Sequence, residues 1–284
     1  MNCYRHPDRE AFVRCQRCER FICPDCQFES AVGFLCPEDA GQNQFANRVV
    51  QMAPRKIRNR MRVARAQSAS GAPVFTYLTI ALCTLVWLAQ ITVPNDWVTI
   101  NFAYIPLGTE QEPWRMLTAG YLHDPSSPIH LLLNVYSLYI FGRELEPMLG
   151  RFNFAALYLL SVVGGSVAVL WLAQPNSWVV GASGAIFGLM AAYFVVLRTM
   201  GANSTQMVGL IAINLAFGFM VQGVSWQGHV GGLITGGVVA FLYSRTRGVS
   251  SRANRVRRIG LVAVLLALVA LAYAGWVINL APLF

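Results

Sequence analysis

The sequence is poor in charge. Only 12% of its 284 residues are Asp, Glu, Lys or Arg, whereas a soluble globular domain carries about 25%. This shortage argues against an ordinary cytosolic globule. The 55% of apolar residues exclude a wholly disordered chain, which would be rich in charge and poor in apolar side chains.

Lysine is almost absent, since Lys56 is the only lysine among 22 basic residues. A composition rich in arginine and nearly free of lysine indicates a GC-rich bacterial genome, and therefore a plasma membrane as the location. The net charge of +9 would suit nucleic-acid binding. Arginine clusters beside apolar segments, however, are typical of the cytoplasmic flanks of membrane proteins, so we expect no nucleic-acid partner.

Cysteine is absent from most of the chain. Six of the seven cysteines lie within the first 36 residues, and Cys83 stands alone in an apolar run, where we expect it to be a small packing residue. Twelve of the 22 basic residues precede position 70, and the chain beyond it is mostly apolar. This pattern predicts a zinc-binding domain at 1–40, a basic linker at 41–72, a core of six membrane spans at 73–244, and a basic loop with a seventh span at 245–284.

The apolar body predicts an all-α polytopic membrane protein. The run at 74–93 contains no charge and is long enough to cross a bilayer as a helix. It begins too late in the chain for a cleaved signal peptide. Six further spans are expected at 129–149, 152–173, 183–199, 206–223, 226–244 and 259–280.

The arginines predict the orientation of these spans. Seven basic residues lie close before the first span and six lie between the sixth and the seventh, so an even number of spans separates the two clusters. Because basic residues of short loops stay in the cytoplasm, we expect a cytoplasmic N-terminus and an extracytoplasmic C-terminus. Arg115 is the only basic residue in the loops of the opposite face.

The long outer loop at 94–128 is expected to lie partly in the membrane interface. Its aromatic residues, which have an apolar body and a polar edge, suit the headgroup zone; they are Trp97, Tyr104, Trp114 and Tyr121. A simple extracytoplasmic loop is the alternative.

Few polar residues enter the spans, and each is therefore a candidate functional residue. His130 and Asn134 are four positions apart and share one face of the second span. Ser183 begins the fourth span between glycines at 181 and 184, and His229 begins the sixth. A lone serine usually bonds to its own helix and a lone histidine to a neighbouring one, so each alone also has a purely structural interpretation.

Together these residues predict a serine hydrolase. Glycines at 184 and 188 and at 228, 232 and 236 form small-residue faces on the fourth and sixth spans, which lets the two helices approach closely. Ser183 would then meet His229, which is suited to accept the proton of the serine hydroxyl. No Asp or Glu lies in spans four to six, which predicts a dyad rather than a triad. His130 and Asn134 offer N–H donors for a tetrahedral oxyanion.

At 73–243 the chain resembles rhomboid intramembrane serine proteases. The resemblance rests on four motifs that occur in the family's order, Trp114-Arg115, His130-x-x-x-Asn134, Gly181-x-Ser183-Gly184 and His229-x-x-Gly232-x-x-x-Gly236. It implies a rhomboid six-helix core, here with a seventh helix. It also implies a serine endopeptidase that hydrolyses single-span or polytopic membrane protein substrates near the outer membrane face, with no cofactor for catalysis.

The resemblance implies a role for each site residue. Ser183 would be the nucleophile and His229 the general base, while His130, Asn134 and the Ser183 backbone N–H would form the oxyanion hole. Three further positions match supporting residues of the family: a second histidine at His123, with two extra residues before His130; an aromatic that packs on the dyad histidine at Phe187; and a glutamate-containing turn at Glu146 with Gly150.

Two other functions are compatible with parts of the sequence. A rhomboid-like pseudoprotease would bind membrane clients without cleaving them, but the four polar site residues argue against it. A transporter or channel gated by a zinc sensor would need charges or broken helices along a path, and the later spans contain none.

The first forty residues contain four ligand pairs with two residues between the members of each: Cys3 and His6, Cys15 and Cys18, Cys23 and Cys26, and Cys36 and Asp39. This spacing predicts two four-coordinate structural zinc sites. Disulfides are the alternative, and a reducing cytoplasm disfavours them.

The order of the pairs resembles B-box-type zinc fingers, which implies that pairs one and three share one metal and pairs two and four the other. Sequential pairing stays open, and Glu38 or water competes with Asp39 for the last position. The partner of this domain is not named by the sequence. The linker at 41–72 lies on anionic lipid or is a plain solvated tether.

Overall fold

The computed structural model describes residues 2–30, 33–40, 72–221, 223–246 and 250–283. The chain divides into two compact units, Met1–Ala66 and Gln67–Phe284. The predicted linker at 41–72 and its arginines lie outside the described residues, apart from position 72.

The N-terminal unit is small and consists of short elements. The strands β1 (Val13–Arg14) and β2 (Phe21–Ile22) pair antiparallel, as do β3 (Phe28–Ser30) and β4 (Gly33–Leu35). A 3-10 turn, η1 (Pro24–Cys26), and the short helix α1 (Pro37–Ala40) complete it. Among its described residues, the buried core consists of five cysteines, Ala11 and Ile22, with a few partly buried apolar side chains packed against them. This is little apolar surface for a domain without further crosslinks.

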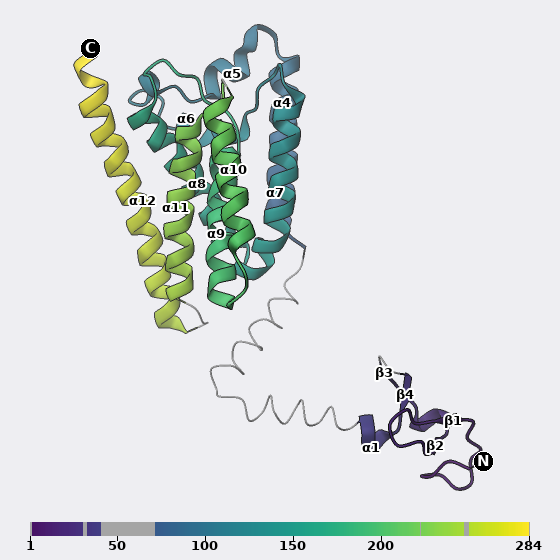
Figure 1. Cartoon of the computed structure of the whole chain (residues 1–284). Helices are drawn as coiled ribbons and strands as arrows, with labels where there is room; N and C mark the ends of the chain where they lie inside the picture. The colour runs from purple at the N-terminus through teal and green to yellow at the C-terminus, as the bar shows by residue number, and fades with distance from the viewer. Residues whose placement is uncertain (1, 31–32, 41–71, 222, 247–249, 284) are drawn as a thin grey trace. The chain divides into compact units, whose positions relative to one another are not determined.

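The second unit is a helical bundle, shown in Figure 1. Its long helices within the described residues are α4 (Val74–Thr92), α7 (Pro128–Leu149), α8 (Arg151–Leu172), α9 (Ser183–Met200), α10 (Thr205–Met220), α11 (Trp226–Arg245) and α12 (Ser251–Asn279). They lie at the seven predicted spans, although α12 begins eight residues earlier than expected.

Four of the described helices are long and apolar enough to cross a membrane: α4, α8, α9 and the segment Ser251–Leu283. The helix α10 is apolar but has only 16 residues. The chain is therefore a multi-pass membrane protein, whose exposed apolar side chains suit a lipid environment.

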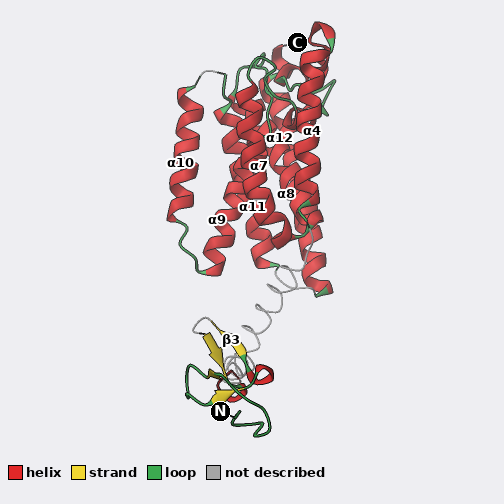
Figure 2. Ribbon diagram, turned by 90° about the vertical axis from the view of Figure 1, so that its right-hand side faces the viewer, coloured by secondary structure: helices red, strands yellow, loops and turns green. Residues whose placement is uncertain are grey.

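The centre of the bundle is formed by α8, α9 and α11, which pack along one another. At the crossing of α9 and α11, a Cβ atom on Gly232 would overlap the carbonyl oxygen of Gly184, and one on Gly236 would overlap the backbone of Gly188. These are the small-residue faces that the sequence predicted would meet. The helix α10 lies at the edge, as Figure 2 shows, and only Met207 and Gly218 of it are buried.

The connection between α4 and α7 is folded rather than extended. It contains α5 (Trp97–Phe102), α6 (Arg115–Thr118) and the 3-10 turns η2 (Pro94–Asp96), η3 (Pro106–Gly108) and η4 (Ala119–Tyr121). The buried Arg115 pairs with Glu112 at 2.6 Å and donates to the Ala103 carbonyl oxygen at 3.2 Å, which ties α6 to α5. The loop lies at the same end of the bundle as Ser183, because the Gly181 N–H donates to Ala119 O.

The aromatic residues of this loop do not behave alike. Trp97 and Trp114 are exposed, as a position in the headgroup zone requires. The expectation for Tyr104 was wrong, because its side chain is fully buried and its hydroxyl bonds to Thr109 Oγ1 at 2.9 Å. A tyrosine hydroxyl that has a hydrogen-bond partner inside the protein does not depend on the membrane headgroup zone for one.

Glu146 explains why the second predicted span contains a carboxylate. Its side chain is buried and accepts hydrogen bonds from the Phe75 and Thr76 backbone N–H groups at 2.9 and 2.8 Å, and from Thr76 Oγ1 at 2.7 Å. It therefore caps the first turn of α4, where N–H groups lack acceptors and a negative charge is favoured.

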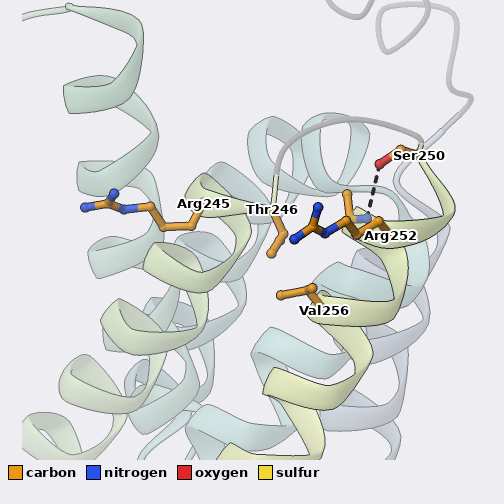
Figure 3. A pocket seen from close by; sticks show the side chains of 6 residues that line it. Arg245, Thr246, Ser250, Arg252 and Val256 are labelled. Carbon is orange, nitrogen blue, oxygen red and sulfur yellow. Dashed lines mark hydrogen bonds between the residues drawn. The ribbon is translucent and has the colours of Figure 1, made fainter.

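Two arginines, Arg245 and Arg252, lie at the junction of α11 and α12 (Figure 3). A hollow of about 220 Å³ lies there, lined by Arg245, Thr246, Ser250, Arg252, Ala253 and Val256. Ser250 Oγ accepts a hydrogen bond from the Ala253 N–H at 3.1 Å and so caps α12. Arg257 donates to the Thr246 carbonyl oxygen at 2.7 Å, which fastens the start of α12 to the end of α11.

Candidate active site and metal centres

The expected nucleophile and base lie at the starts of two packed helices. Ser183 is the first residue of α9, and His229 lies in the first turn of α11. Nε2 of His229 is 2.9 Å from Oγ of Ser183, a hydrogen-bond distance, and the imidazole is buried. The glycine contacts between α9 and α11 bring together two residues that are 46 positions apart. A serine hydroxyl that donates to an imidazole has the geometry of an activated nucleophile.

The imidazole of His229 is held by packing. Phe187, one helical turn after Ser183, stacks on it with ring centroids 4.3 Å apart. Gly218 of α10 approaches the ring so closely that a Cβ atom there would lie 3.0 Å from Nδ1. Among the described residues, that Nδ1 has no hydrogen-bond partner, so no carboxylate orients the ring there. Sequence analysis did not single out Gly218, because a glycine in an apolar helix gives no sign of what packs against it.

His130 and Ser183 both lie close to Gly181. A Cβ atom on Gly181, whose φ is +124°, would be 3.0 Å from Nε2 of His130 and 3.6 Å from Oγ of Ser183. On the other edge of the imidazole, Nδ1 of His130 accepts a hydrogen bond from the Asp124 backbone N–H at 3.2 Å. Asn134 donates one amide N–H to the His130 carbonyl oxygen at 2.8 Å, which leaves its second N–H available.

The imidazole of His123 lies beside that of His130. The two ring centroids are 5.3 Å apart, and within the described part of the chain neither ring nitrogen of His123 has a hydrogen-bond partner. Burial, together with the nearby His130, lowers the pKa of His123 to about 3, which keeps it neutral. Its backbone is held by Gln90 of α4, a residue that sequence analysis did not select.

Comparison with known proteins identifies the family of the chain. The family model described as "Rhomboid domain" matches residues 110–246. The Bacillus subtilis rhomboid protein YdcA is 32% identical over 182 residues, which cover 60% of this chain and 88% of YdcA. The chain belongs to the rhomboid family. The matched region contains His123, His130, Asn134, Ser183 and His229.

Two longer relatives match only in part. Rhomboid protease GluP of Bacillus subtilis is 36% identical over 184 residues, which cover 59% of this chain and 34% of GluP. RHOMBOID-like protein 6, mitochondrial, of Arabidopsis thaliana is 37% identical over 139 residues, which cover 46% of this chain and 44% of that protein. The chain therefore spans less than half of the length of each. The family model does not reach the N-terminal unit.

In that unit, the structure gathers the eight expected ligands into two groups. Each group has four ligand atoms within 4.8 Å of one another, and the groups are Cys3, His6, Cys23 and Cys26, and Cys15, Cys18, Cys36 and Asp39. Pairs one and three thus come together, as do pairs two and four.

The spacing of these atoms fits zinc. A tetrahedral ion with Zn–S about 2.3 Å and Zn–N about 2.0 Å holds neighbouring ligand atoms about 3.5–3.8 Å apart. Nδ1 of His6 is 3.4 Å from Sγ of both Cys23 and Cys26 and 4.0 Å from Sγ of Cys3, and Sγ of Cys18 is 3.6 Å from Sγ of Cys36.

Of the two candidates for the fourth position of the second group, Asp39 lies beside the cysteines. Its Oδ2 lies 3.2 Å from Sγ of Cys15 and 3.2 Å from Sγ of Cys36. The competitor Glu38 points elsewhere and pairs with Arg20 at 2.9 Å. Backbone N–H groups also donate to the sulfurs, since the Cys36 N–H is 3.2 Å from Sγ of Cys15. Such donors favour the thiolate form that binds a metal.

Proposed function

We propose that this rhomboid-family protein is a serine endopeptidase that hydrolyses peptide bonds of membrane protein substrates within the bilayer. The observation that carries the proposal is the 2.9 Å contact between Ser183 Oγ and His229 Nε2. The names of two relatives, GluP and Rhomboid-like protease 1 of Toxoplasma gondii, describe them as proteases, which supports the same activity here.

In the proposed reaction, Oγ of Ser183 attacks the carbonyl carbon of the scissile bond while His229 Nε2 accepts the hydroxyl proton. The carbonyl oxygen becomes an oxyanion, toward which His130 Nε2–H, the second Asn134 N–H and the Ser183 backbone N–H donate. Collapse breaks the C–N bond, and His229 returns the proton to the leaving amine. Water then attacks the acyl-enzyme with His229 as base, and Ser183 is released.

The arginine pattern supports a cytoplasmic N-terminus and an extracytoplasmic C-terminus in a plasma membrane, with all seven long helices spanning as six plus one. Ser183 then lies near the outer face. From that end, water for the second half-reaction reaches the site.

A pseudoprotease that only binds membrane clients is the rival proposal. It would need neither a nucleophile beside a base nor donors around them. The stacking of Phe187 on His229 and the hydrogen bond from Asp124 to His130 both orient groups that only chemistry uses. These contacts favour the protease.

We also propose two structural zinc ions in the N-terminal unit, one in each four-residue group. The donor sets leave no position open for a substrate, so zinc there would stabilise the fold and take no part in hydrolysis. The unit is proposed to bind a partner.

The first prediction tests the dyad. Ser183→Ala removes the nucleophile and should abolish cleavage of a single-span substrate and labelling by a fluorophosphonate, with the fold intact. His229→Ala should be equally inactive, because nucleophile and base act as a unit.

The matched control for this test is Ser161→Ala. Ser161 is fully buried in α8, and its hydroxyl has no partner among the described residues, so its loss should leave cleavage near the wild-type rate. Cleavage by the Ser183→Ala variant would reject the proposed function.

A further inference from the structure

Gln90 is a buried amide in the span before the site. Only 2% of its surface is exposed, and a buried amide must find partners. Its Oε1 accepts from the His123 backbone N–H at 2.9 Å, and its Nε2 donates to the His123 carbonyl oxygen at 2.9 Å. Nε2 also donates to Thr99 Oγ1 at 2.9 Å. One side chain thus holds both backbone polar groups of a single loop residue.

The next residue of the loop reaches the expected oxyanion hole. The Asp124 backbone N–H donates to Nδ1 of His130 at 3.2 Å. The Asp124 carbonyl oxygen accepts from the indole N–H of Trp87 at 3.1 Å, and Trp87 lies one turn before Gln90 on α4. The helix α4 therefore forms hydrogen bonds with two successive loop residues, and the second of them also contacts His130.

This contact determines which nitrogen of His130 carries the proton. A backbone N–H can only donate, so Nδ1 must present its lone pair to Asp124. In neutral imidazole the proton then lies on Nε2, the atom on the Gly181 and Ser183 side. The opposite tautomer would present a lone pair to a developing oxyanion and would repel it.

We propose that Gln90 is a positioning residue, which holds the loop at His123 so that Asp124 keeps His130 in the Nε2–H tautomer. The inference rests on the proposed function, in which His130 donates to the oxyanion. It adds α4, a helix that contributes no group to the reaction, to the elements that set the reactivity of the site.

The substitution Gln90→Met tests this, because it keeps the length of the side chain and removes its hydrogen bonds. We expect kcat to fall about tenfold, less than for the loss of an oxyanion donor, with KM within about twofold. Trp87→Phe should also lower kcat, but by a smaller factor. The control is Cys83→Ala, a buried truncation on α4 outside these hydrogen bonds, which should leave kcat unchanged.

The deciding readout is the ¹⁵N spectrum of the histidine rings at a pH above neutral, which separates protonated from unprotonated ring nitrogens. His130 is assigned by comparison with His130→Asn. In the wild type we expect the proton on Nε2, and in Gln90→Met a mixture of tautomers.

Two outcomes would overturn the inference. One is the Nδ1–H tautomer in the folded wild type, which can be read even where Gln90→Met does not fold. The other is a folded Gln90→Met protein with unchanged kcat and an unchanged His130 signal. Either result leaves the proposed protease standing if Ser183→Ala is inactive, so the two proposals fail separately.

Discussion

Asn134 shows how one buried amide can serve two purposes. One N–H donates to the His130 carbonyl oxygen one turn earlier, and Oδ1 is buried with no partner among the described residues. An unpaired buried oxygen has a cost of about 1–3 kcal/mol, and such costs concentrate at functional sites. The cost of this unpaired oxygen indicates that the Asn134 amide is placed for its second N–H rather than for stability.

The second prediction concerns this amide. Asn134→Ala should lower kcat by about 10²-fold or less, because one donor among several is removed. Asn214→Ala is the matched control, since Asn214 donates to the Leu210 carbonyl oxygen at 2.8 Å in the same i to i−4 geometry but within α10. Equal losses of kcat in both variants would mean that Asn134 serves only its helix.

At the scale of elements, the site is a product of helix packing. The helices α9 and α11 approach until glycine backbones touch, and this approach places Ser183 within hydrogen-bond reach of His229. No side chain larger than hydrogen fits at Gly232. The distance between nucleophile and base is therefore set by a backbone contact between Gly184, the residue after Ser183, and Gly232, one helical turn after His229.

The third prediction follows from that contact. Gly232→Ala should force α11 away from α9, destabilise the protein by about 1–3 kcal/mol and reduce cleavage strongly, since the dyad distance grows. Gly209→Ala on α10 is the control, because a Cβ atom there meets nothing within 4 Å. Thermal unfolding and cleavage rates would be measured for both. A Gly232→Ala protein with wild-type stability and rate would contradict the packing.

At the scale of the whole molecule, the two units depend on different forces. The membrane unit has an extensive buried apolar core, whereas the small core of the N-terminal unit consists mainly of cysteines. The two proposed zinc ions would supply the stability that this small core lacks.

The fourth prediction is metal content. We expect about two zinc ions per chain, with about one remaining in Cys15→Ser and both remaining in Cys83→Ala, whose cysteine lies outside the two groups. Metal analysis of protein prepared without chelators would measure this, and a zinc-free wild type would reject the sites. Fluorophosphonate labelling of Ser183 should survive chelation, because neither Ser183 nor His229 belongs to the two groups.

The fifth prediction concerns where substrates are cut. With Ser183 near the outer face, the scissile bond should lie near the outer end of the substrate helix. A helix hides its carbonyl groups in hydrogen bonds, so Gly, Ser or Pro near that end should speed cleavage by lowering the cost of unwinding. Replacing these residues with Leu should slow it. Mass spectrometry of the products would locate the cut, and a site in the cytoplasmic half would contradict the proposed orientation.

Much of the fold follows from sequence alone. In lipid every backbone polar group must be paired internally, so long apolar runs have little choice but to be helices, and the predicted spans agree with α4 and α7–α12 to within a few residues apart from the start of α12. Polar residues are so rare in these runs that Ser183, His229, His130 and Asn134 stand out without any structure. The spacing of the Cys, His and Asp residues likewise picked out the eight residues that the structure gathers into two groups.

Tertiary structure decided which of these residues meet and what surrounds them. Gly218 beside His229, Gln90 behind the His123 loop and the burial of Tyr104 depend on contacts between distant segments, for which local spacing holds no information. The grouping of cysteine pairs one with three and two with four depends on how four short strands fold back. Local sequence pattern determines whether a segment is helical, because the backbone hydrogen bonds of a helix are local. A site is made by packing between segments that are distant in the sequence.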